Sequence, residues 1–499
     1  MHLDGSKLKT HADVSCDVAI IGTGAGGAVL GKELAERGLS VVFCEEGAWH
    51  APASHRDLAS QATARLYRDH AMTVAFGTPL IPVPMGKAVG GTTVVNSGTC
   101  LRPRPETHER WARGHGLEGL EYEELVPHYE HVEKELGVRE ADPRVISRSN
   151  LVFGKILERE GFRVKPLARN APDCRGCGMC CYGCTSGAKR SMEVSYIPKA
   201  LSAGARLYSS CRAKKIIMKG MRAIGVEGVF LSETGHRTGQ RLRVRADLVV
   251  LAAGALHTPA LLMANGLVQS PQVGRNLILH PASKVFAEFD TEIDGWNGIP
   301  QGLSVEALRE EGIVFEGAFL PPDLGAVMNP LRGREVHAFM RRYRFTAVFG
   351  FMIRDSAAGR IMRIPFVGPV MRYDLSPIDA RKMKKAALLL AEACLEHGAR
   401  RVIPMIHGPV KEFRGRVDLD AFRAGRISPR DVEAAAFHPL CTARMGRNPG
   451  EGVVDSNGKV FGCEGLYVCD GSALPSSPGV NPQLVIMALA RRMAHQNNF

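Results

Sequence analysis

The sequence predicts an α/β protein: a Rossmann-like nucleotide-binding domain assembled from discontinuous segments, with an inserted α+β domain built on an antiparallel sheet. The first observation is a strand–helix–strand unit with a glycine-rich turn at residues 17–46. The second is that strands suited to the same parallel sheet recur only at residues 205–253. The third is the alternation of apolar and polar residues over 285–375, which is typical of antiparallel strands. A chain of 499 residues is long enough for two such domains.

Composition places the chain among soluble globular proteins, with 45% hydrophobic and 23% charged residues. The net charge of +13 comes from scattered lysines and arginines, which argues against nucleic-acid binding but allows contact with an anionic membrane surface. No apolar run is long enough for a transmembrane segment, and the first residues lack the apolar stretch of a secretion signal. Eight of the 13 cysteines are scattered singly, as in proteins with reduced thiols, so we expect a cytoplasmic location.

The first strand–helix–strand unit carries a dinucleotide-binding turn. A buried strand at 17–22 precedes a helix over about 26–37, and the next strand covers 39–46. Glycines spaced GxGxxG permit a tight turn, close approach of a pyrophosphate and packing of helix on strand, and the helix N-terminus attracts phosphate. Glu45 ends the second strand, where an acid binds the ribose of FAD or NAD rather than NADP. The alternative is a turn that serves packing alone. The predicted contact residues are Gly22, Gly24, Ala25, Gly26, Gly27 and Glu45.

A second glycine-rich turn at 86–98 offers further groups to a diphosphate. Gly90, Gly91 and Thr92 supply backbone amides and a hydroxyl, and Asn96 follows them. Asn96 is equally suited to capping a turn through its own side chain. We therefore expect this segment to face the dinucleotide, with two open interpretations for Asn96.

The remaining elements follow from periodicity and from proline and glycine positions. Residues 51–85 are proline-rich and irregular, which predicts a loop, and 105–165 carry helical spacing. Strands and hairpins occupy 205–253, and the apolar run at 247–254 is a buried parallel strand of the nucleotide sheet. Residues 378–399 form an amphipathic helix that glycine ends.

Taken in order, the motifs resemble those of the glucose–methanol–choline (GMC) flavoprotein oxidoreductases. They are GTGAGG with Glu45, GGTTVVN, LAAGALHTPALLMANGL, HPLCTARMG and DGSALPSSPGVNPQ, and they cover most of the chain outside the inserted domain. The resemblance implies FAD, a substrate domain and oxidation of a CH–OH group, and HPL followed by GVNPQ is most similar to cholesterol oxidase and long-chain alcohol oxidases. The implied division is an FAD-binding domain of 1–104, 171–282 and 433–499 and a substrate domain of 105–170 and 283–432.

The same resemblance assigns further cofactor contacts. Ala213 matches a backbone contact to adenine, and Asp470 with Gly471 matches the ribityl and phosphate side of FAD, although a structural turn is the alternative for the last two. Some relatives link FAD through a histidine where this chain has Val95, so non-covalent FAD is expected. The other cofactor positions implied by the matched motifs are Ala253, Gly254, Asn481, Pro482 and Gln483.

His438 is implied to be the catalytic residue and Asn481 its partner. Loss of a hydride from a carbinol carbon requires loss of the hydroxyl proton, and histidine accepts protons near neutral pH. An asparagine can orient the same oxygen without adding charge. A packing histidine before Pro439 is the alternative for His438, and Asn481 could also cap a helix that starts at Pro482.

Five cysteines crowd into the segment CRGCGMCCYGC. Four of them have the C-x2-C-x2-C-x3-C spacing of ferredoxin-type iron–sulfur loops, although Thr185 stands where proline usually follows. Thiolates at this spacing also suit zinc, and disulfides or free thiols are the third interpretation. Cys181 is left as a spare thiol. The predicted ligands of an iron–sulfur cluster, or alternatively of zinc, are Cys174, Cys177, Cys180 and Cys184.

Residues 313–370 are rich in Phe, Met, Leu and Val and are expected to line the substrate pocket. With few tryptophans in the chain, an apolar alcohol is favoured over a sugar. The sequence therefore predicts FAD-dependent oxidation of a primary or secondary alcohol, with oxygen, a protein or a quinone as the electron acceptor. A flavin-scaffold lyase and a non-catalytic redox carrier are the alternatives.

Overall fold

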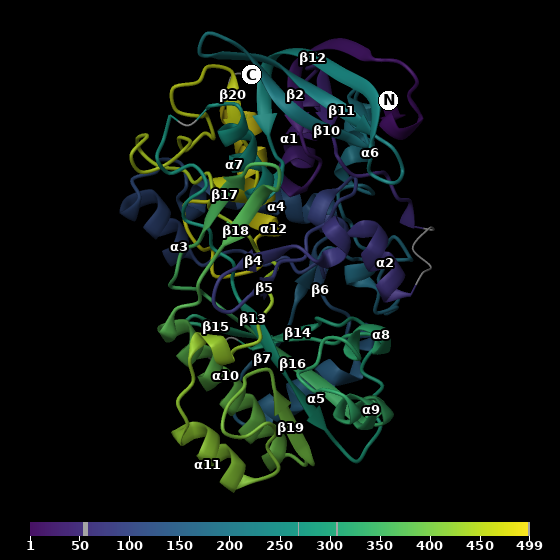
Figure 1. Ribbon diagram of the computed structural model, residues 1–499, viewed down its shortest axis with the longest axis vertical. Coiled ribbons are helices and arrows are strands. Elements are labelled where there is room, and N and C mark those ends of the chain that lie inside the picture. Colours follow the sequence, from purple (N-terminus) through teal and green to yellow (C-terminus); the bar gives the residue numbers. More distant parts are fainter. Residues whose placement is uncertain (53–57, 268, 306–307, 498–499) are drawn as a thin grey trace.

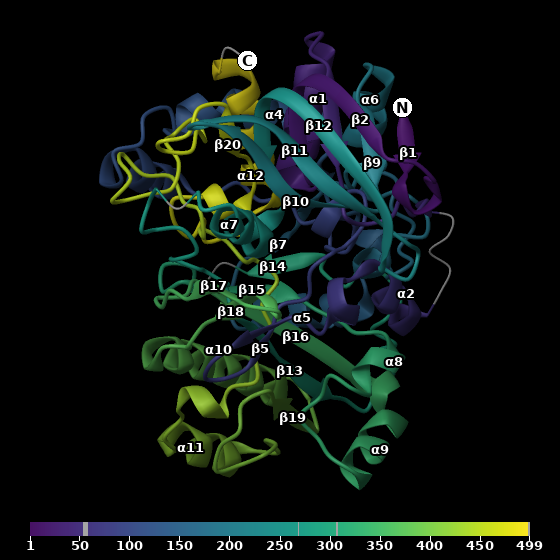
Figure 2. The same cartoon turned by 45° about the horizontal axis from the view of Figure 1, so that its top comes forward.

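The computed structural model describes residues 1–52, 58–267, 269–305 and 308–497. Two parts lie along its long axis (Figures 1 and 2). The upper part contains the sheet of β2 (Ala12–Ile21) and β12 (Arg237–Leu251), and the lower part contains the sheet of β13 (Ala282–Glu288) and β16 (Thr346–Ile353). The predicted combination of an α/β nucleotide domain with a second domain on an antiparallel sheet is confirmed.

The upper sheet is assembled from distant segments, as predicted. Its strand order is β1-β9-β3-β2-β12-β11-β10, and β20 also pairs with β12. Because β12 runs parallel to both β2 and β20, it joins the first and last segments of this sheet. Its other strands are β1 (His2–Asp4), β3 (Val41–Cys44), β9 (Arg206–Ser209), β10 (Cys211–Lys219), β11 (Arg222–Leu231) and β20 (Leu466–Val468).

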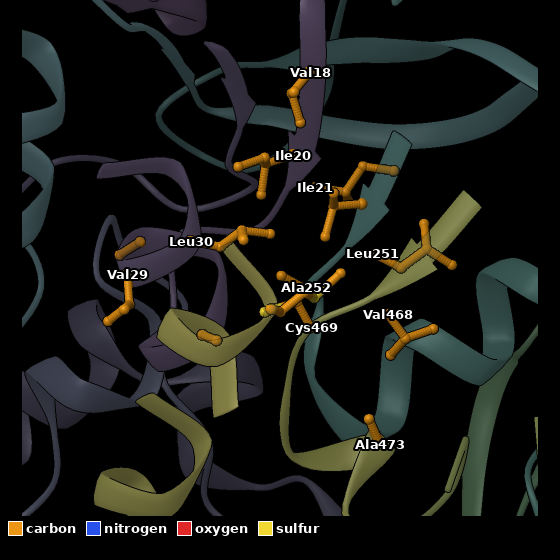
Figure 3. Packing of buried hydrophobic residues seen from close by; sticks show 14 of the residues in the cluster. Val18, Ile20, Ile21, Val29, Leu30, Leu251, Ala252, Val468, Cys469 and Ala473 are labelled. Carbon is orange, nitrogen blue, oxygen red and sulfur yellow. The ribbon is translucent and has the colours of Figure 1, made fainter. Parts of the chain in front are cut away.

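Helix α1 (Ala25–Glu36) packs on this sheet and begins within one residue of the predicted start. Figure 3 shows the contact region, in which Ile20 of β2, Leu30 of α1, Leu251 of β12 and Val468 of β20 belong to one buried cluster. Burial of each such side chain contributes about 1.5–3 kcal/mol. The helices that pack against α1 are α6 (Tyr196–Ser202) and α12 (Gln483–Gln496).

The lower sheet has the order β19-β13-β16-β15-β14-β7, and every pairing in it is antiparallel. Helices α5 (Arg148–Arg159) and α10 (Pro377–Glu396) pack on it. The helix predicted at 378–399 is thus confirmed as α10, and the Ser376 side chain caps its first turn. The remaining strands are β7 (Val164–Pro166), β14 (Leu303–Val305), β15 (Ile313–Gly317) and β19 (Arg401–Pro404).

Two sequence predictions need correction. Within the described part of 51–85 the chain forms a helix and two strands rather than only a loop, because Ala75 and Ile81 are fully buried in strands too short to show periodicity. The region 285–375 also contains helices α8 and α9 between its strands. The elements concerned are α2 (Ala59–Leu66), β4 (Val74–Phe76), β5 (Ile81–Pro82), α8 (Pro322–Gly325), α9 (Arg334–Arg341), β17 (Arg360–Ile364) and β18 (Gly368–Arg372), the strands pairing in the order β17-β18-β4-β5.

Segment 105–170 is divided between the two cores. Helix α4 packs on α12 and buries Leu125 and Tyr129 in the core of the upper part, whereas α5 buries Phe153 against the lower sheet. The exact domain boundaries therefore stay a prediction. The elements not yet given are α3 (Pro105–Glu109), α4 (Tyr122–Leu136), β6 (Arg139–Glu140), β8 (Ala168–Arg169), α7 (Gly254–Ala264) and α11 (Arg416–Ala424).

Candidate active site

A cavity of about 1760 Å³ is lined by residues of both parts of the molecule. Ligand pockets for one small molecule usually measure about 300–1,000 Å³, so this volume suits a dinucleotide together with a substrate. Except for Gly27 and Gly90, all the residues predicted to bind the cofactor or to act in catalysis line it. They are Gly22, Gly24, Ala25, Gly26, Glu45, Gly91, Thr92, Asn96, Ala213, Ala253, Gly254, His438, Asp470, Gly471, Asn481, Pro482 and Gln483.

The first glycine turn is shaped to admit a phosphate group. Gly22 has φ +105°, and a Cβ at Gly26 would lie 1.9 Å from the carbonyl oxygen of Cys469. A Cβ at Gly27 would lie 2.3 Å from the carbonyl oxygen of Gly22, which explains why Gly27 sits behind the cavity wall. Gly24 differs, since a Cβ there would meet no atom within 4 Å. The turn therefore leaves open space at the N-terminus of α1, where backbone amides attract anions.

Glu45 is held at the end of β3 by donors of the same turn. One carboxylate oxygen accepts hydrogen bonds from the Thr23 amide at 2.9 Å and hydroxyl at 2.7 Å, and the other accepts from the Gly47 amide at 2.8 Å. Burial raises the pKa of Glu45 above its ordinary value. Because each carboxylate oxygen has two lone pairs, one acceptor position remains for a ribose hydroxyl.

Asn96 binds the protein itself, which supports the turn interpretation. Its Nδ2 donates to Gln483 Oε1 at 2.7 Å, and its Oδ1 accepts from the Gly98 amide at 3.0 Å. Gln483 Nε2 in turn donates to the Thr99 carbonyl at 2.7 Å. These bonds fix the second glycine-rich segment to the start of α12.

Asp470 has a comparable structural role beside the cavity. Its carboxylate accepts hydrogen bonds from the Gly254 amide at 2.8 Å, the Thr258 hydroxyl at 2.6 Å and the Ser472 amide at 2.8 Å. The C-terminal segment is thereby held to the start of α7. The structural alternative for Asp470 is supported, while a contact to cofactor stays a prediction.

His438 lies at the cavity wall with a buried Nδ1 that has no hydrogen-bond partner among the described residues. Removal from water lowers the pKa of His438 to about 4, so the imidazole is neutral at pH 7. The ring of His280 meets it edge-on, with centroids 5.4 Å apart. His280 is itself fixed by a 2.6 Å hydrogen bond between Nε2 and the Ser477 hydroxyl. The neighbour thus restricts the orientation of the His438 ring.

Asn481 contacts a buried acid from the lower sheet. Its side chain lies beside the Glu316 carboxyl and opposes the effect of burial on the pKa of that acid, while Asn481 Oδ1 and Glu316 Oε1 both lack a hydrogen-bond partner among the described residues. Helix α12 begins at Gln483 with Pro482 in the cap position and no side-chain cap bond. The predicted capping role of Asn481 is therefore wrong, and its amide is free to serve the cavity.

Glu316 is a site residue that the sequence analysis missed. Burial raises its pKa to about 7, and Gln301 Nε2 donates to its second oxygen. Thr99 donates to Gln301 Oε1 at 2.9 Å, so the network continues to the second glycine-rich segment. The sequence did carry a signal for Glu316, which is a single acid within the apolar strand GIVFEGAF. His280 also had a signal, because it precedes a proline as His438 does.

The predicted metal centre is not supported. The residues that the structure describes include all five clustered cysteines, yet among them no three metal-ligating side chains gather at a common point. Cys177 is exposed, whereas Cys180 and Cys184 are buried, and all are free thiols. The iron–sulfur and zinc predictions for Cys174, Cys177, Cys180 and Cys184 are corrected accordingly.

Two buried cations explain the local structure of the cysteine loop. Lys189 Nζ donates to the carbonyls of Val94 at 2.8 Å, Asn96 at 2.7 Å and Cys180 at 2.8 Å. The Arg169 guanidinium donates to the Ser97 carbonyl at 2.6 Å and to Cys180 Sγ at 3.1 Å. Because these cations already lie against the thiols, the loop braces the cofactor-facing segment without a metal ion.

The rest of the cavity is largely apolar. The expectation that 313–370 lines it is confirmed by side chains from β15, β16 and the adjoining loops. The charged residues that line this half include Lys284, Glu316, Arg363, Arg430 and Glu433. The apolar lining residues of this half are Phe319, Leu320, Leu324, Val348, Phe351, Met352, Met405 and Val432. Within the described ranges, no helix has the length and apolarity needed to cross a membrane.

Comparisons with known proteins agree with this architecture. Two family models described as GMC oxidoreductase match residues 63–282 and 363–490. A GMC-type oxidoreductase of Mycobacterium tuberculosis is 38% identical over 483 residues, which is 96% of this chain and 75% of that protein. A long-chain-alcohol oxidase of Arabidopsis thaliana is 29% identical over 505 residues, covering 96% of this chain and 67% of that protein.

Solved structures share the fold at low identity. The pyridoxine 4-oxidase from Mesorbium loti superposes with a TM-score of 0.73 and 18% identity, over 96% of this chain and 99% of that one. A formate oxidase of Aspergillus oryzae gives 0.72 and 17%, over 96% and 97%. The two family models and the relative at 38% identity establish that the chain belongs to the GMC oxidoreductase family.

Proposed function

We propose that this protein is an FAD-dependent oxidoreductase that converts an apolar primary or secondary alcohol to an aldehyde or ketone. The observation that carries the proposal is the shared cavity, which the glycine turn and Glu45 line together with His438 and Asn481. One volume can therefore hold a dinucleotide and a second small molecule beside these two side chains.

The residues present fit FAD. Gly24 leaves room for the diphosphate at the start of α1, Gly91 brings its backbone close to Gly24, and Glu45 keeps an acceptor for ribose. When bound, FAD supplies the acceptor for the hydride that leaves the carbinol carbon. Val95 lines the cavity and has no group that forms a covalent link, which supports non-covalent binding.

His438 is proposed to accept the hydroxyl proton. Since its pKa is lowered to about 4, the ring is unprotonated at neutral pH and its ring nitrogens can accept a proton. The edge-on contact with His280 holds the ring at the cavity wall. A low pKa makes a weak base, so close placement of the hydroxyl must supply much of the effect.

Asn481 is proposed to orient the same hydroxyl. Its amide nitrogen can donate to the hydroxyl oxygen, which leaves the hydroxyl hydrogen for His438, and the side chain lies beside Glu316. Glu316 thus acts as a positioning residue.

An apolar alcohol suits the lining of the lower half, and the Arabidopsis relative is a long-chain-alcohol oxidase. The electron acceptor is proposed to be oxygen, a protein or a quinone. A metal cluster would have favoured a protein acceptor over oxygen, but among the described residues the cysteines do not gather, so the loop gives no argument for one acceptor over another.

The test is an anaerobic visible spectrum of the purified protein with long-chain, aryl and sterol alcohols, glucose and choline. We expect a flavin spectrum that bleaches with apolar alcohols, and flavin that acid precipitation releases into solution. A flavin that no alcohol reduces would instead favour the lyase or carrier alternative. Faster reduction by glucose than by every apolar alcohol would contradict the substrate class.

A further inference from the structure

We propose that Lys284 binds a carboxylate in the cavity, so that the substrate is a hydroxy acid whose apolar chain separates the alcohol from the acid group. This inference deepens the proposed function and rests on it. It starts from a charged side chain that the proposed reaction does not use.

Lys284 lies in a cross-strand row with the catalytic neighbourhood. In antiparallel register it faces Gly350 of β16, and Gly350 faces Glu316 of β15. Paired residues on adjacent strands project to the same face, and all three line the cavity. Because strands are about 4.8 Å apart, the backbones of Lys284 and Glu316 are about 10 Å apart. Gly350 has no side chain, so the row stays open between them.

The ammonium of Lys284 lacks a full counter-charge. Among the described residues none accepts a hydrogen bond from it, and its recorded contact is the Phe286 ring, with the centroid 5.5 Å away. Glu433 is the acid whose charge raises the pKa of Lys284, but its Oε1 already lies 2.6 Å from His407 Nε2. Removal from water lowers the pKa of Lys284 to about 8, so it is still a cation at pH 7.

A second cation reinforces this end of the cavity. Arg430 also lines it, and no described acid forms an ion pair with its guanidinium. On the same face of β16 as Gly350, Val348 and Met352 add apolar wall to the cavity. The apolar wall therefore has a reacting site at one end and a poorly compensated cation about two strand spacings away. A hydroxy carboxylate matches this arrangement better than a neutral alcohol does, because its carboxylate supplies the missing counter-charge.

The experiment compares ω-hydroxy acids of six to sixteen carbons with their methyl esters, using the FAD-loaded protein. We expect kcat/KM for the acid to exceed that for the ester by about 10-fold to 100-fold, the effect typical of a hydrogen bond to a charged group. The acid-to-ester ratio of kcat/KM should be greatest at intermediate chain length, because the row of Lys284, Gly350 and Glu316 fixes the distance between the cation and the reacting site. Lys284→Met should bring the ratio close to one, and Lys284→Arg should largely keep it.

A matched control and a binding measurement make the result decisive. Lys214 lines the cavity on its nucleotide side, so Lys214→Met should leave the acid-to-ester ratio unchanged. Dodecanoate, which cannot be oxidised, should perturb the flavin absorbance of the wild type and bind at least tenfold more weakly to Lys284→Met. Oxidation of alcohols without any preference for acids would overturn this inference alone. If dodecanoate binding depends on Lys284 but no alcohol or hydroxy acid is oxidised, the proposed reaction is overturned instead.

Discussion

The two halves of the cavity are built by different means. The nucleotide half consists largely of backbone, because Gly22 and Gly26 bring main chain within contact distance and leave space at Gly24. The substrate half consists of side chains such as Glu316 and Lys284, which adjacent antiparallel strands place in one row. Backbone sites tolerate no added atoms, whereas side-chain sites tolerate substitution and change specificity. The same fold can therefore keep one cofactor while its substrate varies.

The largest effect is expected at Gly26, where the backbone half is tightest. In Gly26→Ala the added Cβ would overlap the Cys469 carbonyl, so α1 must move away from the C-terminal segment. Overpacking of this kind costs about 1–3 kcal/mol or more. We expect a lower melting temperature and protein without flavin. Gly24→Ala is the control, since its methyl meets only open space: flavin affinity should fall, but the melting temperature of the apoprotein should not. Equal flavin content in both variants and the wild type would contradict this view of the turn.

His438→Ala should have the next largest effect and should not affect the nucleotide half. Loss of a positioned proton acceptor lowers rates by about 10²–10⁴-fold. Stopped-flow flavin reduction under anaerobic conditions measures the change, with flavin content as the check on folding. His236, an exposed histidine between β11 and β12 that does not line the cavity, provides the control: flavin in His236→Ala should be reduced at the wild-type rate. A wild-type rate in His438→Ala would remove this residue from the mechanism.

Glu316 should have a smaller effect that depends on pH. Burial raises its pKa to about 7, so the carboxyl is protonated below pH 7 and ionised above it. Ionisation places a negative charge beside Asn481, so the wild-type pH profile of kcat/KM should change slope near pH 7, by up to about tenfold in rate. Glu316→Gln keeps a hydrogen-bonding group but cannot ionise. Its profile should lose that inflection and keep the one at lower pH due to His438; an inflection near pH 7 that persists would assign it to another group.

Cys177 should have the smallest effect, because its side chain is exposed and the structure gives the loop no metal site. Cys177→Ser should change the free energy of unfolding by no more than about 0.5 kcal/mol and leave the flavin reduction rate unaltered. Iron, sulfide and zinc analysis of anaerobically purified wild type should find none at stoichiometric level. Stoichiometric metal that Cys177→Ser loses would restore the metal-centre hypothesis.

The sequence predicted the nucleotide half well because its determinants are local. A glycine turn between a strand and a helix, followed by Glu45 at the end of the next strand, specifies its own geometry over thirty residues. The placement of His438 and Asn481 in the same cavity also agrees with expectation. Their roles remain proposals.

The substrate half could not be predicted in the same way. Glu316 and Lys284 meet only through the register of β13, β16 and β15, and register is set by long-range pairing. The cysteine loop was mispredicted for a related reason. Its spacing suits a metal, but the flanking Arg169 and Lys189 bind the distant carbonyls of Ser97 and Val94 and so hold the loop against the cofactor-facing segment.

The pairing of β20 with β12, and the contact of Gly26 with Cys469, have a consequence for biosynthesis. The phosphate-binding turn is made first, but the backbone that closes it is made more than four hundred residues later. A nascent chain therefore cannot complete the cofactor pocket on the ribosome before its C-terminal segment emerges. Until then the unpaired edge of β12 stays exposed, which makes interrupted translation a direct route to aggregation.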